Sequence, residues 1–358
     1  MSKGGTRMTH DKPRLERRLR DRYSRQTILQ SIGEEGQARL VGATVTVIGC
    51  GALGSNIAAL LVRAGIGHVR IVDRDLIEYH NLQRQVLFDE EDIKAGLPKA
   101  VAAERRLKIV NSNVEVEGIV ADVNYSNIEG FCAGADVILD GLDNIETRFL
   151  INDVSLKLGI PWVYGGAIMT TGMTMTIVPG ETPCFRCFSH TVPAPGSMPT
   201  CETVGILGTV PAIIGSLQAT EAIKLLVNRD QINRDLIVID AWQGTFDRLK
   251  LNRYPDCPAC QGRYEFLEAK FDVKVTSLCG QSRSVQVVDT AAGKIDLDAL
   301  AARLPDSARV NRTEYMLSFI AGDHEINVFP DGRAIIKGTI DQAVARDLYT
   351  KHVKSRLR

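Results

Sequence analysis

VTVIGCGALGSNIAALLVRAGIGHVRIVDRD, residues 45–75, decides the fold of this 358-residue chain. Small and β-branched residues indicate a strand over 43–48, the glycine turn GCGALG follows at once, and residues 55–64 have the apolar spacing of a helix. HVRIVD, residues 68–73, is a second strand, so the unit is a parallel βαβ crossover. In such a unit the three glycines permit a tight turn, close approach of phosphate, and close packing of the helix. They are Gly49, Gly51 and Gly54.

Strands and helices keep alternating after this unit, with predicted strands at 114–119, 135–140, 161–164 and 173–178 and helices at 98–107 and 147–158. The alternation predicts an α/β fold: a doubly wound, Rossmann-like, mostly parallel sheet whose ligand lies beyond the carboxyl ends of the strands. From about Phe271 the pattern restarts as a small α+β module that contains a hairpin at FPDGRAIIKG. We therefore expect a basic flexible tail over 1–21, a nucleotide-binding domain over 22–270, and a small α+β domain over 271–358.

The composition is that of a soluble globular protein, with 43 basic and 43 acidic side chains. This balance argues against nucleic acid or a membrane surface as partner. The longest apolar run, 204–217, is too short to span a bilayer, and no signal peptide is visible, so we expect a cytoplasmic protein. In that reducing compartment the eight cysteines predict metal or thiol chemistry rather than disulfides.

The glycine turn alone does not identify the nucleotide, because an ATP enzyme, a nicotinamide or flavin dehydrogenase and a turn without ligand all fit it. Asp73, nineteen residues after Gly54, is placed to accept a hydrogen bond from a ribose hydroxyl. The next run contains Asn81, Arg84 and Lys99. Two cations and an amide suit a triphosphate that loses pyrophosphate, whereas a dehydrogenase needs an open floor for its nicotinamide ring.

The segment DGLDN, residues 140–144, follows a predicted buried strand at the same edge of the sheet. A carboxylate beside phosphate is a good Mg²⁺ ligand, which makes Asp143 the candidate. We count Asn144 with the nucleotide-binding residues. The alternative is that Asp143 only caps the helix that begins near Thr147.

In their order along the chain, RYSRQ at 22–26, GCGALG, Asp73, NLQRQ, Lys99 and DGLDN resemble the ThiF/MoeB family, relatives of the ubiquitin-activating enzymes. The match runs from Arg22 to about Glu268. The resemblance implies a homodimer that uses ATP and Mg²⁺ to adenylate the C-terminal glycine of a ubiquitin-like sulfur carrier protein ending in Gly-Gly. Such carriers supply sulfur for thiamine, molybdopterin cofactor or tRNA thiolation.

The same resemblance implies roles for individual residues. Arg25 would reach into the ATP site of the partner subunit. Arg84 and Lys99 would bind the phosphates, Asn81 would support them, and Asp143 would hold Mg²⁺.

Four cysteines form two C-x-x-C pairs, PCFRCF and DCPACQ, about seventy residues apart. Such pairs can bring four thiolates to one tetrahedral Zn²⁺, and two independent redox pairs are the alternative. The resembling family contains the same zinc site. The predicted ligands are Cys184, Cys187, Cys257 and Cys260.

The remaining cysteines are Cys50, Cys132, Cys201 and Cys279. In the family a cysteine at the place of Cys201 can form a thioester or an acyl disulfide with the carrier, although a bystander thiol is the alternative. Cys50 and Cys132 suit packing, and a sulfur role for Cys279, at the start of the second module, is a hypothesis. Larger relatives end in a rhodanese domain, but the segment from Phe271 contains no cysteine beyond Cys279. A separate cysteine desulfurase or rhodanese-type protein would then supply the sulfur, and carrier docking by the C-terminal module is a hypothesis.

Three other functions compete with this one. The same ATP site could activate a different carboxylate, on RNA-bound threonine or on a peptide. An NAD-dependent oxidoreductase would need the pocket free of the cations named above. A binding-only scaffold would have lost its ATP chemistry, yet every catalytic-looking position is filled.

Overall fold

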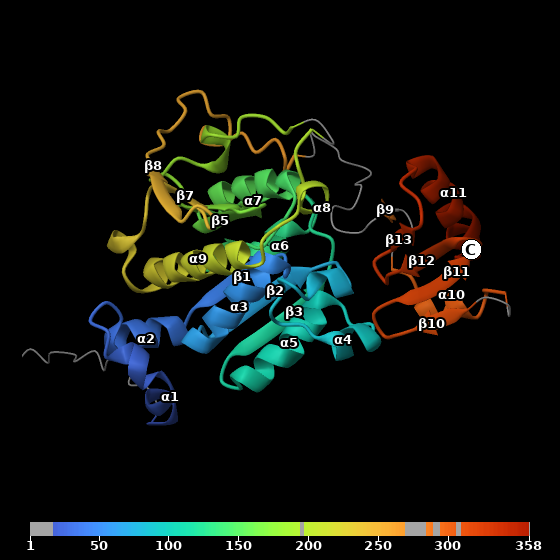
Figure 1. Ribbon diagram of the computed structural model, residues 1–358, viewed down its shortest axis with the longest axis horizontal. Coiled ribbons are helices and arrows are strands. Elements are labelled where there is room, and N and C mark those ends of the chain that lie inside the picture. Colours follow the sequence, from blue (N-terminus) through green and yellow to red (C-terminus); the bar gives the residue numbers. More distant parts are fainter. Residues whose placement is uncertain (1–16, 194–196, 269–283, 289–293, 306–308, 358) are drawn as a thin grey trace, which may run out of the picture.

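The computed structural model describes residues 17–193, 197–268, 284–288, 294–305 and 309–357. An eight-stranded sheet of order β3-β2-β1-β4-β5-β6-β7-β8 forms the centre of the larger domain (Figure 1). From β3 to β5 the neighbours pair in parallel, and from β5 to β8 they pair antiparallel. The strands are β1 (Thr44–Ile48), β2 (His68–Asp73), β3 (Glu115–Val120), β4 (Val137–Asp140), β5 (Trp162–Ile168), β6 (Thr171–Ile177), β7 (Leu236–Asp240) and β8 (Thr245–Leu249).

Helices cover both faces of this sheet, so its central strands are buried on both sides: β1 is buried from its second residue on, and β4 is buried throughout. One apolar core joins α3, α5 and α9 to the sheet, and a second joins α6, α7 and the cysteine loops. The α-helices of the larger domain are α1 (Arg17–Thr27), α2 (Gly33–Val41), α3 (Ala52–Ala64), α4 (Glu90–Lys94), α5 (Lys99–Val110), α6 (Ile128–Cys132), α7 (Ile145–Leu158), α8 (Cys201–Val204) and α9 (Thr209–Val227). Short 3-10 turns are η1 (Tyr79–Asn81), η2 (Phe185–Cys187) and η3 (Arg229–Gln231).

The predicted doubly wound α/β fold is confirmed, and the differences lie in short or exposed elements. Strand β2 has the predicted bounds, whereas β8 begins three residues before the predicted strand at 248–251, and its residues are all exposed, so burial gave no signal there. Helix α1 begins at Arg17, inside the segment predicted to be tail. The rest of that tail lies outside the described residues.

Helix α9 is long and apolar enough to cross a membrane by length and composition, and it is the one such helix in the described part of the chain. Buried helices of a protein core have the same composition. In this structure α9 packs on β5, β6 and α3, with Gly215 against Asn56 and Ile57. Its apolar character is therefore explained by its central place in the fold.

The C-terminal module is a five-stranded antiparallel sheet of order β10-β11-β12-β13-β9 with its own apolar core (Figure 1). The predicted hairpin joins β12 and β13, and Asp341 caps the last helix. The module is the predicted α+β domain, and its predicted boundary at 270/271 lies outside the described residues. Its elements are β9 (Ser284–Val288), α10 (Leu297–Ala301), β10 (Val310–Arg312), β11 (Leu317–Ala321), β12 (His324–Val328), β13 (Arg333–Lys337), α11 (Gln342–His352) and η4 (Lys354–Arg356).

Candidate active site and metal centre

The glycine loop between β1 and α3 contains two glycines that packing requires and one that it does not. Gly49 has a φ of +90°, and a Cβ on Gly54 would lie 1.9 Å from the Gly49 carbonyl oxygen. A Cβ on Gly51 would meet no atom closer than 3.8 Å. Gly51 is the N-cap of α3, where no side chain caps the helix. Bare amides and open space at a helix N-terminus are what an incoming phosphate needs.

The DGLDN segment packs directly on this glycine loop. The Gly141 amide donates to the Ile48 carbonyl oxygen at 2.8 Å, and a Cβ on Gly141 would lie 2.2 Å from the Gly49 carbonyl oxygen. Asn144, not Asp143, caps α7, because its Oδ1 accepts from the Thr147 amide at 3.0 Å. The alternative that Asp143 only caps the helix is therefore wrong. Because Asn144 Oδ1 caps α7, the predicted nucleotide contact of Asn144 would be made by its Nδ2 amide, and this contact stays a prediction.

A buried ion pair that the sequence did not indicate holds the DGLDN segment in place. Arg148 Nε donates to Asp140 Oδ2 at 2.9 Å, and Arg148 Nη2 donates to the carbonyl oxygens of Leu142 and Gly165. Gln218 of α9 donates to the Asp140 carbonyl oxygen at 2.8 Å. No short motif marks these partners: Arg148 lies eight residues after Asp140 in the next helix, and Gln218 lies 78 residues away.

Asp73, at the end of β2, supports the glycine loop with one carboxylate oxygen and the turn after β2 with the other. Oδ2 accepts from the Cys50 amide at 2.6 Å, and Oδ1 accepts from the Asp75 amide at 2.7 Å. Burial raises the pKa of the Asp73 carboxyl, and the nearby Lys99 opposes this effect. Its predicted contact with a ribose stays a prediction, and its structural role was not foreseen.

Lys99, at the start of α5, is buried beside these carboxylates. Its Nζ lies 3.0 Å from Asp75 Oδ2. Burial works against its charge, but Asp75, Asp73 and Asp143 outweigh burial and raise the pKa of Lys99. Lys99 is therefore charged at neutral pH, which a phosphate ligand requires. It also lies near Asp143, the candidate magnesium ligand.

Asn81 and Arg84 lie on the turn that follows β2. Asn81 Oδ1 accepts from the Glu78 amide at 3.0 Å, so part of this side chain holds the turn η1. Arg84 Nη1 donates to the His80 carbonyl oxygen at 2.7 Å. Gly208, just before α9, lies close to the Arg84 side chain.

Cys201 is the first residue of α8, in the segment between the first C-x-x-C pair and α9. Burial and the Asp143 carboxylate raise the pKa of the Cys201 thiol, while Arg84 opposes them, so the structure brings these three groups together. Met169, at a φ of 53°, exchanges backbone hydrogen bonds with Gly205 and Leu207 and so fixes the end of this segment. The thiol is protonated at neutral pH, and its covalent role stays a prediction.

Arg25 lies at the other end of α3 from the glycine loop. In the RYSRQ motif, Tyr23 accepts from Asn111 Nδ2 at 2.9 Å, and Gln26 donates to the Ala64 carbonyl oxygen at 2.9 Å. These contacts anchor α1 near the C-terminus of α3 and leave Arg25 exposed. A helix of 13 residues is about 20 Å long. Arg25 is thus remote from the glycine loop of its own chain.

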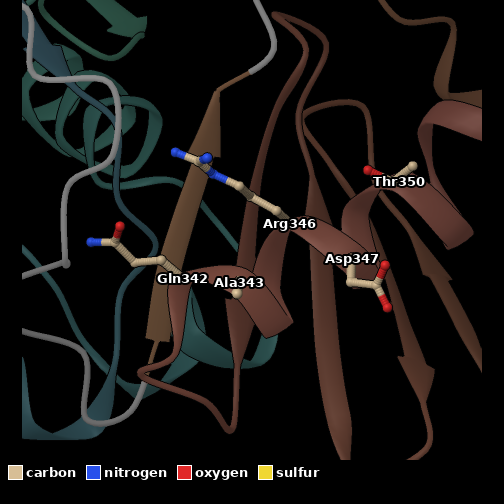
Figure 2. Close-up of a pocket in the computed structure, with 5 residues that line it drawn as sticks. All are labelled: Gln342, Ala343, Arg346, Asp347 and Thr350. Atoms are coloured by element: carbon tan, nitrogen blue, oxygen red, sulfur yellow. The ribbon is translucent and has the colours of Figure 1, made fainter.

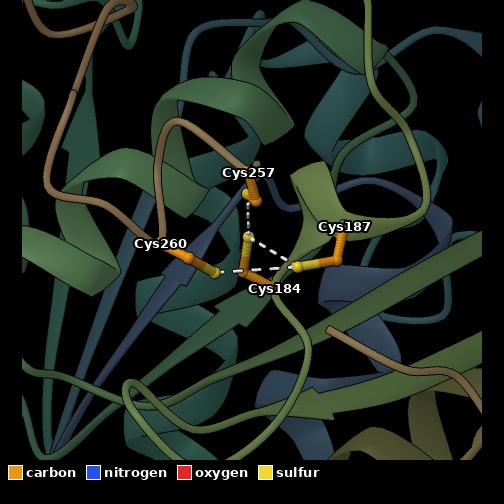
Figure 3. Close-up of side chains that lie close together, drawn as sticks. All are labelled: Cys184, Cys187, Cys257 and Cys260. Carbon is orange, nitrogen blue, oxygen red and sulfur yellow. Dashed lines mark hydrogen bonds between the residues drawn. The ribbon is translucent and has the colours of Figure 1, made fainter. Parts of the chain in front are cut away.

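Four thiols, of Cys184, Cys187, Cys257 and Cys260, meet where the two C-x-x-C loops cross (Figure 3). Their sulfurs lie 3.5 Å (184 to 257), 3.7 Å (184 to 187) and 3.6 Å (187 to 260) apart. Ligands at about 2.3 Å from a tetrahedral Zn²⁺ have sulfurs about 3.8 Å apart. Among the described residues this is the one cluster of three or more potential metal ligands, and its geometry fits a metal.

The other cysteines behave as packing residues where the structure describes them. Cys50 and Cys132 are buried, which raises the pKa of both thiols, and the predicted packing role is confirmed. Cys279 lies outside the described residues. A surface depression of about 500 Å³ on the outer face of α11 is lined by exposed residues and contains none of the groups above (Figure 2).

The model of the ThiF family matches residues 23–259. Among curated proteins, the sulfur carrier protein ThiS adenylyltransferase of Bacillus subtilis is 40% identical, covering 93% of this chain and 99% of that protein. The SAMP-activating enzyme E1 of Haloferax volcanii is also 40% identical, over 73% of this chain and 96% of its own. Among solved structures, that of E. coli MccB with ATP matches with a TM-score of 0.59 and 25% identity, covering 67% of this chain and 74% of MccB.

Proposed function

The chain belongs to the ThiF family, and on this basis we propose that it is an ATP-dependent adenylyltransferase for a ubiquitin-like sulfur carrier protein. One observation supports the proposal: Lys99 lies at the carboxyl edge of the sheet beside the Asp73–Asp75 turn that holds the glycine loop, and the Asp143 carboxylate is close enough to affect the pKa of Lys99. The similarity to a ThiS adenylyltransferase over nearly the whole chain supports the same choice of substrate.

The reaction needs charge neutralisation and positioning rather than a base. An oxygen of the carrier's C-terminal carboxylate, already ionised near neutral pH, forms a bond to the α-phosphorus of ATP. The bond from that phosphorus to the bridging oxygen breaks, and pyrophosphate leaves with the electron pair. Lys99 and Arg84 would hold the phosphates, and the amides at the start of α3 would bind them along the backbone.

Magnesium would bind through Asp143, an exposed carboxylate that does not cap α7. When bound, the ion would supply additional positive charge for the phosphate oxygens. Arg148 and Asp140 would keep the segment that bears Asp143 in place.

Zinc fits the four-cysteine cluster, whose sulfur separations match one tetrahedral ion. Bound zinc would act structurally, by joining the loop after β6 to the loop after β8. No step of the reaction is assigned to it.

A homodimer would account for Arg25. This residue is too far from its own glycine loop to serve it, and the family resemblance assigns it to the site of the partner subunit. Cys201 would lie beside the activated carboxylate and would be available for a later covalent step. A separate cysteine desulfurase or rhodanese-type protein would supply sulfur, for thiamine, molybdenum cofactor or tRNA thiolation, in the cytoplasm.

Two alternatives are disfavoured by specific observations. A dehydrogenase would not place Lys99 and Arg84 over its nicotinamide site, and the relatives above are named as adenylyltransferases or activating enzymes. Activation of a different carboxylate, such as one on a peptide, is disfavoured because the two relatives at 40% identity are named for a sulfur carrier or for SAMP, whereas the structures of MccB with MccA match at 24–25% identity.

Pyrophosphate exchange from ATP, run with each candidate carrier ending in Gly-Gly, tests the proposal. Exchange that depends on one carrier would support it, and exchange with none would contradict it. Asp143→Ala should abolish exchange without loss of fold, while Asp230→Ala, an exposed carboxylate in η3, serves as the matched control. Mixing Arg25→Ala with Asp143→Ala should restore part of the activity, because one site of a heterodimer would contain both wild-type residues.

A further inference from the structure

The C-terminal module docks on the turn that follows β2. Leu76 from this turn packs with Met316, Phe329 and Ile335 of the module in a small buried apolar cluster. Lys337 of β13 pairs with Glu78 at 3.4 Å. The module therefore contacts the segment that leads from Asp73 to Lys99.

Arg333, the first residue of β13, is the deepest polar contact of this interface, with a side chain 1% exposed. Its Nη1 donates to the Arg74 carbonyl oxygen at 3.0 Å, and its guanidinium stacks over Phe329 at 3.9 Å. Its Nε and Nη2 make no hydrogen bond within the described residues, although Nε lies 3.5 Å from Asp331 Oδ2. A buried cation with so few partners destabilises the fold unless another role retains it.

The carbonyl group that Arg333 binds lies between the two carboxylates of the site. Asp73 holds the Cys50 amide of the glycine loop, and Asp75 holds the Lys99 ammonium. Burial opposes ionisation of Asp75, but Lys99, Arg74 and, to a smaller extent, Arg333 outweigh it and lower its pKa. A shift of the Arg74 peptide would move both carboxylates at once.

A second contact holds the neighbouring strand end. Arg74 Nη1 donates to Asp122 Oδ1 at 2.6 Å, and Gln286 Nε2 of the module donates to Asp122 Oδ2 at 3.0 Å. Between the module and β3 there is a cleft of about 470 Å³, lined by residues that include Val120, Tyr315 and Phe329. The module thus borders the carboxyl edge of β2 and β3, where a doubly wound fold binds its ligand.

We propose that Arg333 is a positioning residue of the nucleotide site, which fixes the Asp73–Asp75 turn through the Arg74 carbonyl group. The C-terminal module would then complete the ATP site rather than serve as the carrier-docking surface. This inference rests on the proposed function for its kinetic readout, but ATP binding alone also reports on it.

The test compares Arg333→Met with Arg346→Met, an exposed arginine on α11 of the same module (Figure 2). A hydrogen bond to a charged group contributes about 1.5–3 kcal/mol, which corresponds to about 10- to 150-fold in affinity. We expect the KM for ATP to rise at least about tenfold in Arg333→Met, with the KM for the carrier unchanged and Arg346→Met like the wild type. An unchanged KM for ATP, or an equal rise in both KM values, would overturn the proposal.

A conservative variant covers the case in which Arg333→Met does not fold. Arg333→Lys keeps the charge but lacks the planar guanidinium, so we expect a KM for ATP raised about threefold and an unchanged carrier KM. Wild-type values for both constants would count against positioning. Calorimetry with ATP and no carrier separates the two hypotheses: a chain that binds ATP but exchanges with no carrier contradicts the proposed function only. If ATP affinity is the same in Arg333→Lys and wild type, this inference fails.

Discussion

Gly51→Ala should separate nucleotide binding from folding. A Cβ at this position meets no atom closer than 3.8 Å, and Gly51 has a negative φ of −79°, outside the left-handed region that favours glycine. The change removes a favourable N-cap residue, which costs about 1 kcal/mol. We expect the melting temperature to fall by no more than about 4 °C.

The same methyl group would occupy the space that a phosphate oxygen needs at the start of α3. Loss of a hydrogen bond to a charged group, about 1.5–3 kcal/mol, predicts an ATP affinity lower by about 10- to 150-fold. The measurements are calorimetric ATP binding and the KM for ATP in pyrophosphate exchange, beside thermal unfolding of each variant.

Two other glycine variants calibrate the result. Gly54→Ala places a methyl carbon 1.9 Å from the Gly49 carbonyl oxygen, so it should impair folding itself. Gly130→Ala, in α6, adds a methyl group in open space and should leave both stability and exchange nearly unchanged. If Gly51→Ala binds ATP as tightly as the wild type, phosphate does not approach this backbone and the assignment of the nucleotide site is wrong.

Three further predictions concern contacts that hold the fold around the two candidate sites together, the third of them at Asp153 of α7, which accepts from the Phe266 amide at 2.9 Å. Cys257→Ser should lower the bound zinc from about one ion per chain to near zero, with a lower melting temperature, and equal metal content in both proteins would contradict the cluster assignment. Arg148→Met removes one partner of a buried ion pair and should lower the free energy of unfolding by about 3–5 kcal/mol in urea titrations; a cost below 1 kcal/mol would show that the pair does not hold the loop. Burial raises the pKa of Asp153 to about 6, so the folded protein binds this proton more tightly than the unfolded chain does. The stability that the protonated carboxyl contributes is therefore full below pH about 4 and is lost as the pH rises through 6. Asp153→Asn should therefore raise stability at pH 8, by at most about 3 kcal/mol, and leave it unchanged near pH 4.

The sequence predicted those parts of the molecule that local pattern controls. Hydrophobic periodicity located β1, α3 and β2, and the spacing of the three glycines located the turn between β1 and α3, because each of these features depends on neighbours in the chain. Spacing also placed the four cysteines in one cluster. Short elements such as α6 and β10, with few apolar residues each, had no periodicity to reveal them.

The supports of the site depend on contacts between distant residues, and no local signal marks them. Gln218 lies 78 residues from Asp140, and Arg333 lies 259 residues from Arg74. Asp73 was expected to face the ribose, yet both of its oxygens also hold main-chain amides, because the turn after β2 folds back onto it. Burial and topology, rather than motif, decide such roles.

The ion pairs around the candidate nucleotide site also affect the electric field that the site projects into the solvent. Lys99 faces Asp75, Arg74 faces Asp122, and Arg148 faces Asp140, so a carboxylate balances each of these three cations, and the two remaining charged groups, Arg84 and Asp143, have opposite signs. Such a site projects little field into the solvent, and diffusional capture of ATP should depend only weakly on ionic strength. Free polyanions such as heparin would then be poor competitors, and the enzyme would discriminate by close fit rather than by long-range attraction.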